Sequence, residues 1–409
     1  MRSLTILLIF ILLLGFTKAS AYGVLSHEAI IDASWDNSIV PLLKHKFPHS
    51  TPEELNKAHA YAYGGAIMPD MGYFPFGSIF FTSLAHYTRS GDFVMNLLSE
   101  SHDINEYAFA LGALAHYNAD RDGHPGAVNL CVSMVYPKVQ EKFGDTVLYE
   151  DDPDAHRRME FGFDVLQVVR GKYAPKSYHD FIGFEVSQPL LERAFLLTYG
   201  LQLKEVFIDL PLAINTFRWS VKTFIPEVTN VAWISKKKEI ENSQPGMSRK
   251  QFNYGLSKAK YHQEWGTNYH KPGVEAYAMA LIIKFFPKLW LTRILKFNSP
   301  SQEAEKLFTK SFDQTVADYS VMLKKCASNS LHLENIDYDT GKKTKPCEYT
   351  LVDDTYLKLL LKLPSQPVEQ VSDQLRQNMI AFYKTVPPNA RNDKEAKECA
   401  DALTWLGLR

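Results

Sequence analysis

The sequence has few cysteines, no excess of charge of either sign, no internal repeat and no low-complexity tract. Its 45 lysines and arginines balance 46 aspartates and glutamates, so the charge does not indicate a polyanionic partner. None of the four cysteines belongs to a C-x-x-C pair, which argues against a thiolate metal site or a dithiol redox motif. Aromatic residues make up 13% of the chain, which excludes a disordered polypeptide and favours a large hydrophobic core.

The first residues have the pattern of a secretory signal. Arg2 supplies the positive start, Leu4 to Phe16 form an almost unbroken apolar run, and Ala19-Ser20-Ala21 offers small residues to a signal peptidase. The apolar run is short for a bilayer span. We therefore predict that residues 1–21 are removed, that Tyr22 becomes the mature N-terminus, and that the protein is secreted or periplasmic. An uncleaved membrane anchor is the alternative.

The rest of the chain is predicted to be mainly helical. Apolar periodicity indicates helices over residues 26–43, from 52 onward, and over 103–120, 153–169, 190–203, 212–224 and 300–325. Thr51 is a predicted N-cap, with Glu54 completing a capping box. His124-Pro125-Gly126 is expected to end the helix over 103–120. Gly64-Gly65 and Met68 to Gly72 are expected to form loops. A polar stretch after Lys236 suggests a boundary between a domain over 22–235 and a mostly helical region of unknown role over 236–409.

A small β-hairpin is predicted late in the chain. Leu331 to Tyr338 and Lys342 to Tyr349 flank the turn Asp339-Thr340-Gly341. Cys326 and Cys347 lie on either side of it, and export permits a disulfide between them, which is one of three ways to pair four cysteines.

Histidines and carboxylates recur at helical spacing in the first part of the chain, where ten of the 13 histidines precede residue 180. His116, Asp120 and His124 stand at i, i+4 and i+8, so one helix face can present all three. His156 and Glu160 repeat the i, i+4 spacing on a later helix. Imidazole and carboxylate are the ligands that zinc prefers outside thiolate sites, and two such helices can enclose metal. A single pair of this kind is more often a helix-surface hydrogen bond.

Two further residues, Tyr22 and His27, acquire meaning from the predicted processing. Cleavage before Tyr22 frees an amine that can chelate a metal together with its own carbonyl oxygen, and His27 is close enough in sequence to join it. His86 and Asp70, taken alone, are as well explained by a buried histidine and by a residue that caps a turn.

Taken together, these residues resemble the zinc-dependent phospholipase C family. The resemblance covers about residues 22–165 and rests on the order of Tyr22-Gly23, Ser26-His27, Pro69-Asp70, Ala85-His86, His116-x-x-x-Asp120, His124 and His156-x-x-x-Glu160. That family shares an all-helical fold and a trinuclear zinc site with the single-strand-specific fungal nucleases. The resemblance thus implies an all-α, multi-helix bundle of this type, followed by the mostly helical extension that contains the hairpin.

The resemblance also implies how three Zn²⁺ ions are held. The first is assigned to Asp70, His86, His116 and Asp120. The second is assigned to His124, His156 and Glu160. The third is assigned to the backbone amine and carbonyl of Tyr22, to His27, and to Asp120 as a bridge.

Two departures from the family pattern qualify these assignments. Only Arg121-Asp122-Gly123 separate Asp120 from His124, where the family has a longer segment, so His124 is expected to approach from a tighter turn, with Asp122 as a substitute oxygen ligand. Nothing after residue 235 matches the family. We expect that region to pack on the metal domain without supplying ligands.

The predicted function is hydrolysis of a phospholipid or related phosphodiester by metal-activated water, with Asp70 as general base. The alternatives are a single-strand nuclease, for which aromatics near residues 61–87 would stack bases, and a metal-stabilised binding protein without turnover. The basic, amphipathic stretch over 281–297 is consistent with membrane-surface contact, although a core helix with a solvated basic face explains it as well.

Overall fold

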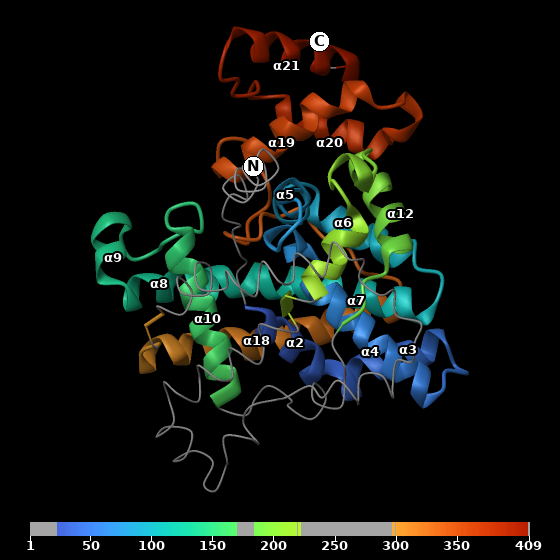
Figure 1. The fold of residues 1–409 in the computed structure, drawn as a ribbon, viewed down its shortest axis with the longest axis vertical. Helices are drawn as coiled ribbons and strands as arrows, with labels where there is room; N and C mark the ends of the chain where they lie inside the picture. Colours follow the sequence, from blue (N-terminus) through green and yellow to red (C-terminus); the bar gives the residue numbers. More distant parts are fainter. Residues whose placement is uncertain (1–22, 170–183, 219, 222–296, 299, 408–409) are drawn as a thin grey trace, which may run out of the picture.

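The computed structural model describes residues 23–169, 184–218, 220–221, 297–298 and 300–407. Over these residues the protein is all-α, as predicted. The expected hairpin is reduced to one isolated antiparallel bridge between Ile336 and Lys343, around the predicted turn. Figure 1 shows α7 running through the middle of the molecule, with helices from early and late parts of the chain packed around it.

Helix α7 (Ile104–Gly123) and helix α4 (Pro52–Ile67) form the tightest pair in the core. Asp103 caps α7 by accepting hydrogen bonds from the backbone N–H groups of Asn105 and Glu106. Glycines permit close approach of the two backbones, because a Cβ on Gly112 would lie 2.0 Å from the carbonyl oxygen of Ala62. The two helices therefore pack backbone against backbone, which fixes the position of the residues that α7 presents.

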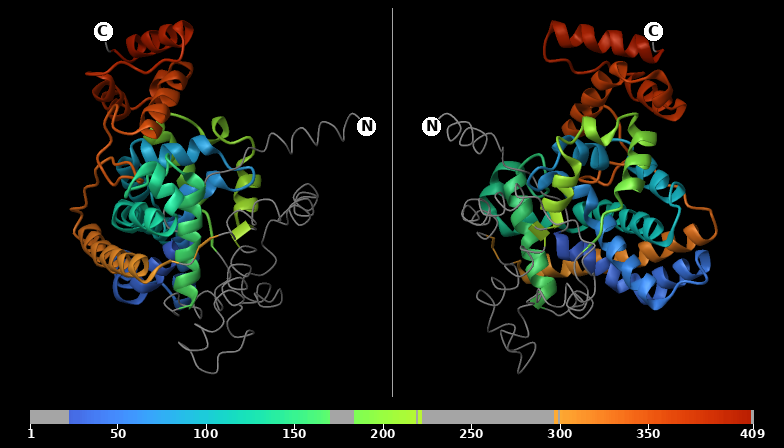
Figure 2. Two further views of the ribbon diagram at one scale, coloured as in Figure 1. Left: turned by 90° about the vertical axis from the view of Figure 1, so that its left-hand side faces the viewer. Right: turned by 45° about the vertical axis from the view of Figure 1, so that its right-hand side comes forward.

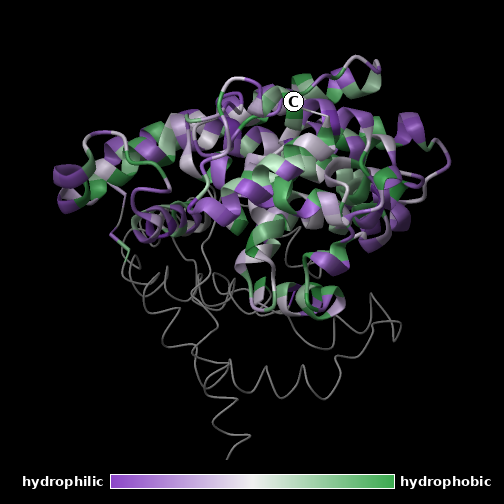
Figure 3. Ribbon diagram, turned by 90° about the horizontal axis from the view of Figure 1, so that it is seen from above, coloured by the Kyte–Doolittle hydropathy of each residue, from purple (hydrophilic) through white to green (hydrophobic). Residues whose placement is uncertain are grey.

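Other helices of the N-terminal part surround this pair. They are α2 (Val24–Ser34), α3 (Val40–Lys46), α5 (Ile79–Tyr87), α6 (Ser90–Ser99), α8 (Asn129–Val135), α9 (Pro137–Phe143), α10 (Pro153–Val169) and α12 (Gln188–Tyr199). Hydrophilic and hydrophobic residues alternate along the helices in Figure 3, as expected for amphipathic elements with one buried face.

Four helices after residue 300 complete the described structure: α18 (Gln302–Ala327), α19 (Thr350–Lys362), α20 (Asp373–Tyr383) and α21 (Asp393–Leu406). Helix α18 packs against α2, α7 and α8, and α19 packs against α5. The last two helices project from the rest of the described molecule, as both views in Figure 2 show. The late region thus packs on the N-terminal helices, as expected from the sequence.

Several predicted helix boundaries are found in the structure. Thr51 and Glu54 form the predicted capping box, and the helix predicted over 153–169 has those bounds. Helix α7 ends at Gly123, directly before His124-Pro125-Gly126, as predicted, but the chain does not leave the helical conformation there. The chain continues through a π-helical turn, η3 (His124–Val128), directly into α8, because the wider turn accommodates Pro125. Both segments predicted as loops are helical: Gly64-Gly65 lies inside α4, and Met68 to Gly72 belongs to a 3₁₀ helix, η2 (Met68–Tyr73).

The suggested pairing of Cys326 with Cys347 is absent, since all four cysteines are free. Cys326 is largely buried at the end of α18, whereas Cys347 is exposed and its backbone N–H bonds to Asp353. The predicted signal segment, the boundary near 235 and nearly all of the amphipathic stretch over 281–297 lie outside the described residues. Among the described helices, none has the length and apolar content that a membrane crossing requires.

Candidate metal centre

Six structural elements deliver the eight predicted side-chain ligands to the interior. Helix α2 carries His27, η2 carries Asp70, α5 carries His86, α7 carries His116 and Asp120, η3 carries His124, and α10 carries His156 and Glu160. None of these residues is more than 5% exposed. Burial of so many ionisable groups is costly unless they are paired or bind a cation.

The first cluster gathers around Asp120. One of its carboxylate oxygens, Oδ2, lies 3.1 Å from His116 Nε2 and 3.7 Å from His86 Nε2. The other, Oδ1, lies 3.5 Å from His27 Nε2. Asp70 Oδ1 is 3.3 Å from His86 Nε2. The structure thus brings five predicted ligands from four elements close together. One Asp120 oxygen faces His116 and His86, and the other faces His27.

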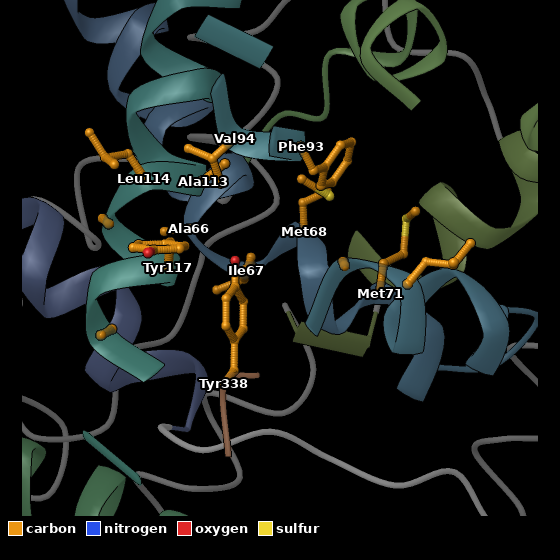
Figure 4. Packing of buried hydrophobic residues seen from close by; sticks show 14 of the residues in the cluster. Ala66, Ile67, Met68, Met71, Phe93, Val94, Ala113, Leu114, Tyr117 and Tyr338 are labelled. Carbon is orange, nitrogen blue, oxygen red and sulfur yellow. The ribbon is translucent and has the colours of Figure 1, made fainter. Parts of the chain in front are cut away.

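Backbone carbonyls orient two of these imidazoles. His86 Nδ1 lies 2.9 Å from the carbonyl oxygen of Thr82, and His116 Nδ1 lies 2.8 Å from that of Ala66. A carbonyl only accepts, so each Nδ1 carries a proton, which leaves Nε2 as the nitrogen that can bind a metal. This arrangement is typical of metal-ligating histidines. The ring of Tyr338, which Figure 4 shows pointing from the late segment toward Ile67, packs against both imidazoles.

Several ligand atoms of this cluster make no hydrogen bond within the described structure. They are Asp70 Oδ1, His86 Nε2, His116 Nε2 and both carboxylate oxygens of Asp120, all buried. A buried polar atom without a partner costs about 1–3 kcal/mol. Two trios of ligand atoms, from His27, His116 and Asp120 and from Asp70, His86 and His116, lie within 4.8 Å of one another. Imidazole nitrogen and carboxylate oxygen at this spacing suit zinc, so the residues present fit the metal that the sequence implied.

The charges of the two clusters also favour a cation. Burial raises the pKa of Asp120. Burial also raises the pKa of Glu160 well above its usual range, and the nearby carboxylates of Asp70 and Asp120 raise it further. Burial alone would lower the pKa of His116, but Asp120 and then Asp70 raise it to about 9. The three carboxylates therefore repel one another in a dry environment, and a bound divalent cation would relieve that repulsion.

The second cluster, of His124, His156 and Glu160, is looser. The imidazole centroids of His124 and His156 lie 5.9 Å apart, and His156 Nδ1 lies 4.0 Å from Glu160 Oε1. His156 Nε2 donates a hydrogen bond to the carbonyl of Val147, which turns Nδ1 toward the carboxylate. Asp122, suggested as a substitute ligand, instead pairs with Arg121 and is partly exposed.

Sequence reasoning missed one residue of this cluster. Asp339 Oδ1 lies 3.4 Å from His124 Nε2, and the Asp339 side chain is only 3% exposed. In the sequence, Asp339 is the first residue of a predicted turn, where an aspartate is ordinary. No local signal separates it from a turn-capping residue, because the residue that it faces, His124, lies more than 200 positions earlier in the sequence.

The predicted backbone ligand Tyr22 lies outside the described residues, which begin at its neighbour Gly23. Gly23 is the N-cap of α2, and a Cβ at this position would lie 2.0 Å from the carboxylate of Asp164. The chain just after Tyr22 is therefore held firmly beside α10.

The fold and the site define an all-α protein with a buried cluster of histidine and carboxylate ligands contributed by separate helices. Residues 18–209, slightly less than half of the chain, match the family model for zinc dependent phospholipase C. The match confirms the resemblance and indicates phospholipase C-type chemistry with zinc. No curated protein and no solved structure gives a significant match.

Proposed function

We propose that the protein is an exported phosphodiester hydrolase that acts on phospholipid with three zinc ions. The observation that carries the proposal is the first cluster, in which buried ligand atoms without hydrogen bonds converge at metal-ligand spacing inside a zinc dependent phospholipase C domain. Secretion rests on the signal-like residues 1–21.

The geometry supports the assignment of ligands to metals. Asp70, His86, His116 and Asp120 would hold the first ion, and His124, His156 and Glu160 the second. Asp120 Oδ1 faces His27 while its Oδ2 faces His116, which suits a carboxylate bridging the first ion and a third held by His27 and the backbone of Tyr22.

Zinc bound in such a site offsets charge on a phosphodiester and lowers the pKa of water toward neutrality. The protein's own contribution is to fix the ligands and to exclude bulk solvent. Asp70 keeps 7% of its side chain exposed, whereas Asp120 keeps none. Of the two carboxylates in the first cluster, this difference in exposure favours Asp70 as the general base that would take a proton from water at the edge of the site.

Phospholipid is favoured over single-stranded nucleic acid as substrate. A nuclease of this type needs aromatic rings free to stack on bases. The aromatics suggested for that role are mostly core residues: Tyr63, Tyr73, Phe74, Phe81 and Tyr87 are buried. Tyr61, Phe76 and Phe80 remain only partly exposed.

The test is to measure zinc content and hydrolysis for the purified secreted protein, for His86→Ala and for His102→Ala. Phosphatidylcholine vesicles and single-stranded DNA are offered in parallel. His102 is the control because its side chain is 68% exposed and lies outside the cluster. We expect His86→Ala to lose zinc and phosphatidylcholine hydrolysis together, and His102→Ala to keep both. A zinc-free wild type, or equal activity in both variants, would refute the proposal. Faster cleavage of single-stranded DNA than of phosphatidylcholine would favour the nuclease alternative instead.

A further inference from the structure

A segment from the late region of the chain crosses the metal centre. The Ser90 hydroxyl accepts a hydrogen bond from the backbone N–H of Ile336 and donates one to its carbonyl. The Tyr117 hydroxyl donates to the carbonyl of Glu334. The backbone N–H of Tyr338 donates to the carbonyl of His86, a residue of the first cluster. These contacts fasten residues 334–338 to α5, α6 and α7.

Asp339, the next residue, is held so that one carboxylate oxygen faces the second cluster. Its Oδ2 accepts hydrogen bonds from the hydroxyls of Tyr87 and Tyr349. Its backbone carbonyl accepts one from the side-chain amide of Asn129. With Oδ2 engaged by two donors, Oδ1 is the oxygen directed at His124 Nε2. Metal-ligating carboxylates are commonly supported in this way by hydrogen bonds to the second oxygen.

The position of Asp339 Oδ1 fits a shared metal better than a hydrogen bond. The 3.4 Å between Oδ1 and His124 Nε2 exceeds the usual N–H···O range of about 2.7–3.2 Å. Two ligands about 2.05 Å from one tetrahedral zinc ion would be ~3.3 Å apart. His124 Nε2 is also buried and makes no hydrogen bond within the described structure.

We propose that Asp339 supplies a carboxylate ligand to the second metal ion, beside His124, His156 and Glu160. This inference rests on the proposed zinc function, and it makes the late region part of the metal centre rather than an appendage. A fourth protein ligand would complete tetrahedral coordination where the predicted set provides only three. It would also compensate for the looser spacing of His156 and Glu160.

The test compares Asp339→Ala with Asp337→Ala in the full chain. Asp337 lies in the same turn and is buried, but its carboxylate bonds to Thr340 instead of facing a predicted ligand. Each protein is dialysed against zinc buffered at a series of free concentrations, and bound metal is counted by mass spectrometry. Far-UV circular dichroism checks that each variant is folded.

We expect Asp339→Ala to lose one zinc equivalent, with affinity at that site weakened by more than about 100-fold, beyond the roughly 10–100-fold effect of an outer-shell partner. Asp337→Ala should keep the wild-type number. Equal zinc binding in both variants, or a loss within the outer-shell range for Asp339→Ala, would overturn the inference.

A second variant keeps the test decisive if Asp339→Ala does not fold. Tyr349→Phe removes one hydrogen bond to Oδ2 and leaves the carboxylate in place. We expect it to weaken one zinc equivalent about tenfold or more, and unchanged binding would count against Asp339 as a ligand. If the wild type binds no zinc at all, the proposed function itself fails. If the wild type and Asp339→Ala bind equally while His86→Ala loses metal, only this inference fails.

Discussion

Asp164 Oδ1 accepts hydrogen bonds from both the backbone N–H and the hydroxyl of Ser26, at 3.0 and 2.9 Å, across 138 residues of sequence. Its second oxygen accepts the N–H of Leu25. The carboxylate therefore satisfies the first turn of α2, the helix that carries His27, and ties it to α10, the helix that carries Glu160.

Asp164→Ala should destabilise the protein by about 1–3 kcal/mol, because it leaves two buried N–H groups and a hydroxyl without an acceptor. Asp154→Ala, in the same helix, is the matched control. Its side chain is 41% exposed and pairs with Arg157, so its loss should cost no more than about 1 kcal/mol. Chemical denaturation at pH 6 measures both, and equal losses would contradict the capping role.

The same residue predicts a dependence of stability on pH. Burial raises the pKa of Asp164 to about 7, against about 3.9 for an aspartate in the unfolded chain. Between these values the folded state holds more protons than the unfolded state, so the stability from the protonated carboxyl is complete below about pH 4 and is lost as pH rises to 7. Asp164→Asn removes this titration. The difference in Tm between the metal-free wild type and Asp164→Asn should therefore decrease as the pH rises from 4 to 7. A difference that stays constant or increases would contradict this prediction.

The contact between α4 and α7 predicts that a glycine-to-alanine substitution changes stability differently at two positions. Gly112→Ala places a Cβ 2.0 Å from the Ala62 carbonyl oxygen and should cost about 1–3 kcal/mol through overpacking. Gly162→Ala in α10 meets its nearest atoms at 3.4 Å, an ordinary contact. It should be neutral or stabilising by up to ~1 kcal/mol through helix propensity. Thermal unfolding of both variants provides the comparison, and a harmless Gly112→Ala would mean that the helices are less closely packed.

Cleavage before Tyr22 should determine whether the third zinc ion binds. Before cleavage the nitrogen of Tyr22 is an amide and a poor ligand, whereas the freed amine has a pKa near 8 and gives up its proton to a metal. A protein retaining one residue before Tyr22 should fold but lose one zinc equivalent and most activity, and His27→Ala should behave likewise. Tyr22→Trp should be almost silent, because only backbone atoms coordinate. Full zinc content in the extended protein would exclude the backbone chelate.

Much of the site could be predicted because local sequence determines it. The i, i+4, i+8 spacing of His116, Asp120 and His124 survives in the structure, since the π-helical turn begins only at His124 and leaves the shared face intact. The capping box at Thr51 needs four adjacent residues and nothing else. Features of this kind depend on helix geometry, which the sequence pattern reports directly.

What could not be predicted depends on contacts between distant segments. Asp339 resembles any turn aspartate until the chain packs it against Tyr87 and His124. Asp164 cannot be recognised as a helix cap from its local sequence. The backbone N–H groups that donate to it belong to α2, about 140 positions earlier in the chain. Only tertiary packing brings these two carboxylates close to the candidate metal ligands.

Anomalous diffraction at the zinc absorption edge, from crystals of the processed protein, tests the central claim most directly. The account predicts one peak among Asp70, His86, His116 and Asp120, a second among His124, His156 and Glu160, and a third beside His27. Zinc peaks confined to the molecular surface, or no peak at the first cluster in zinc-containing crystals, would contradict it.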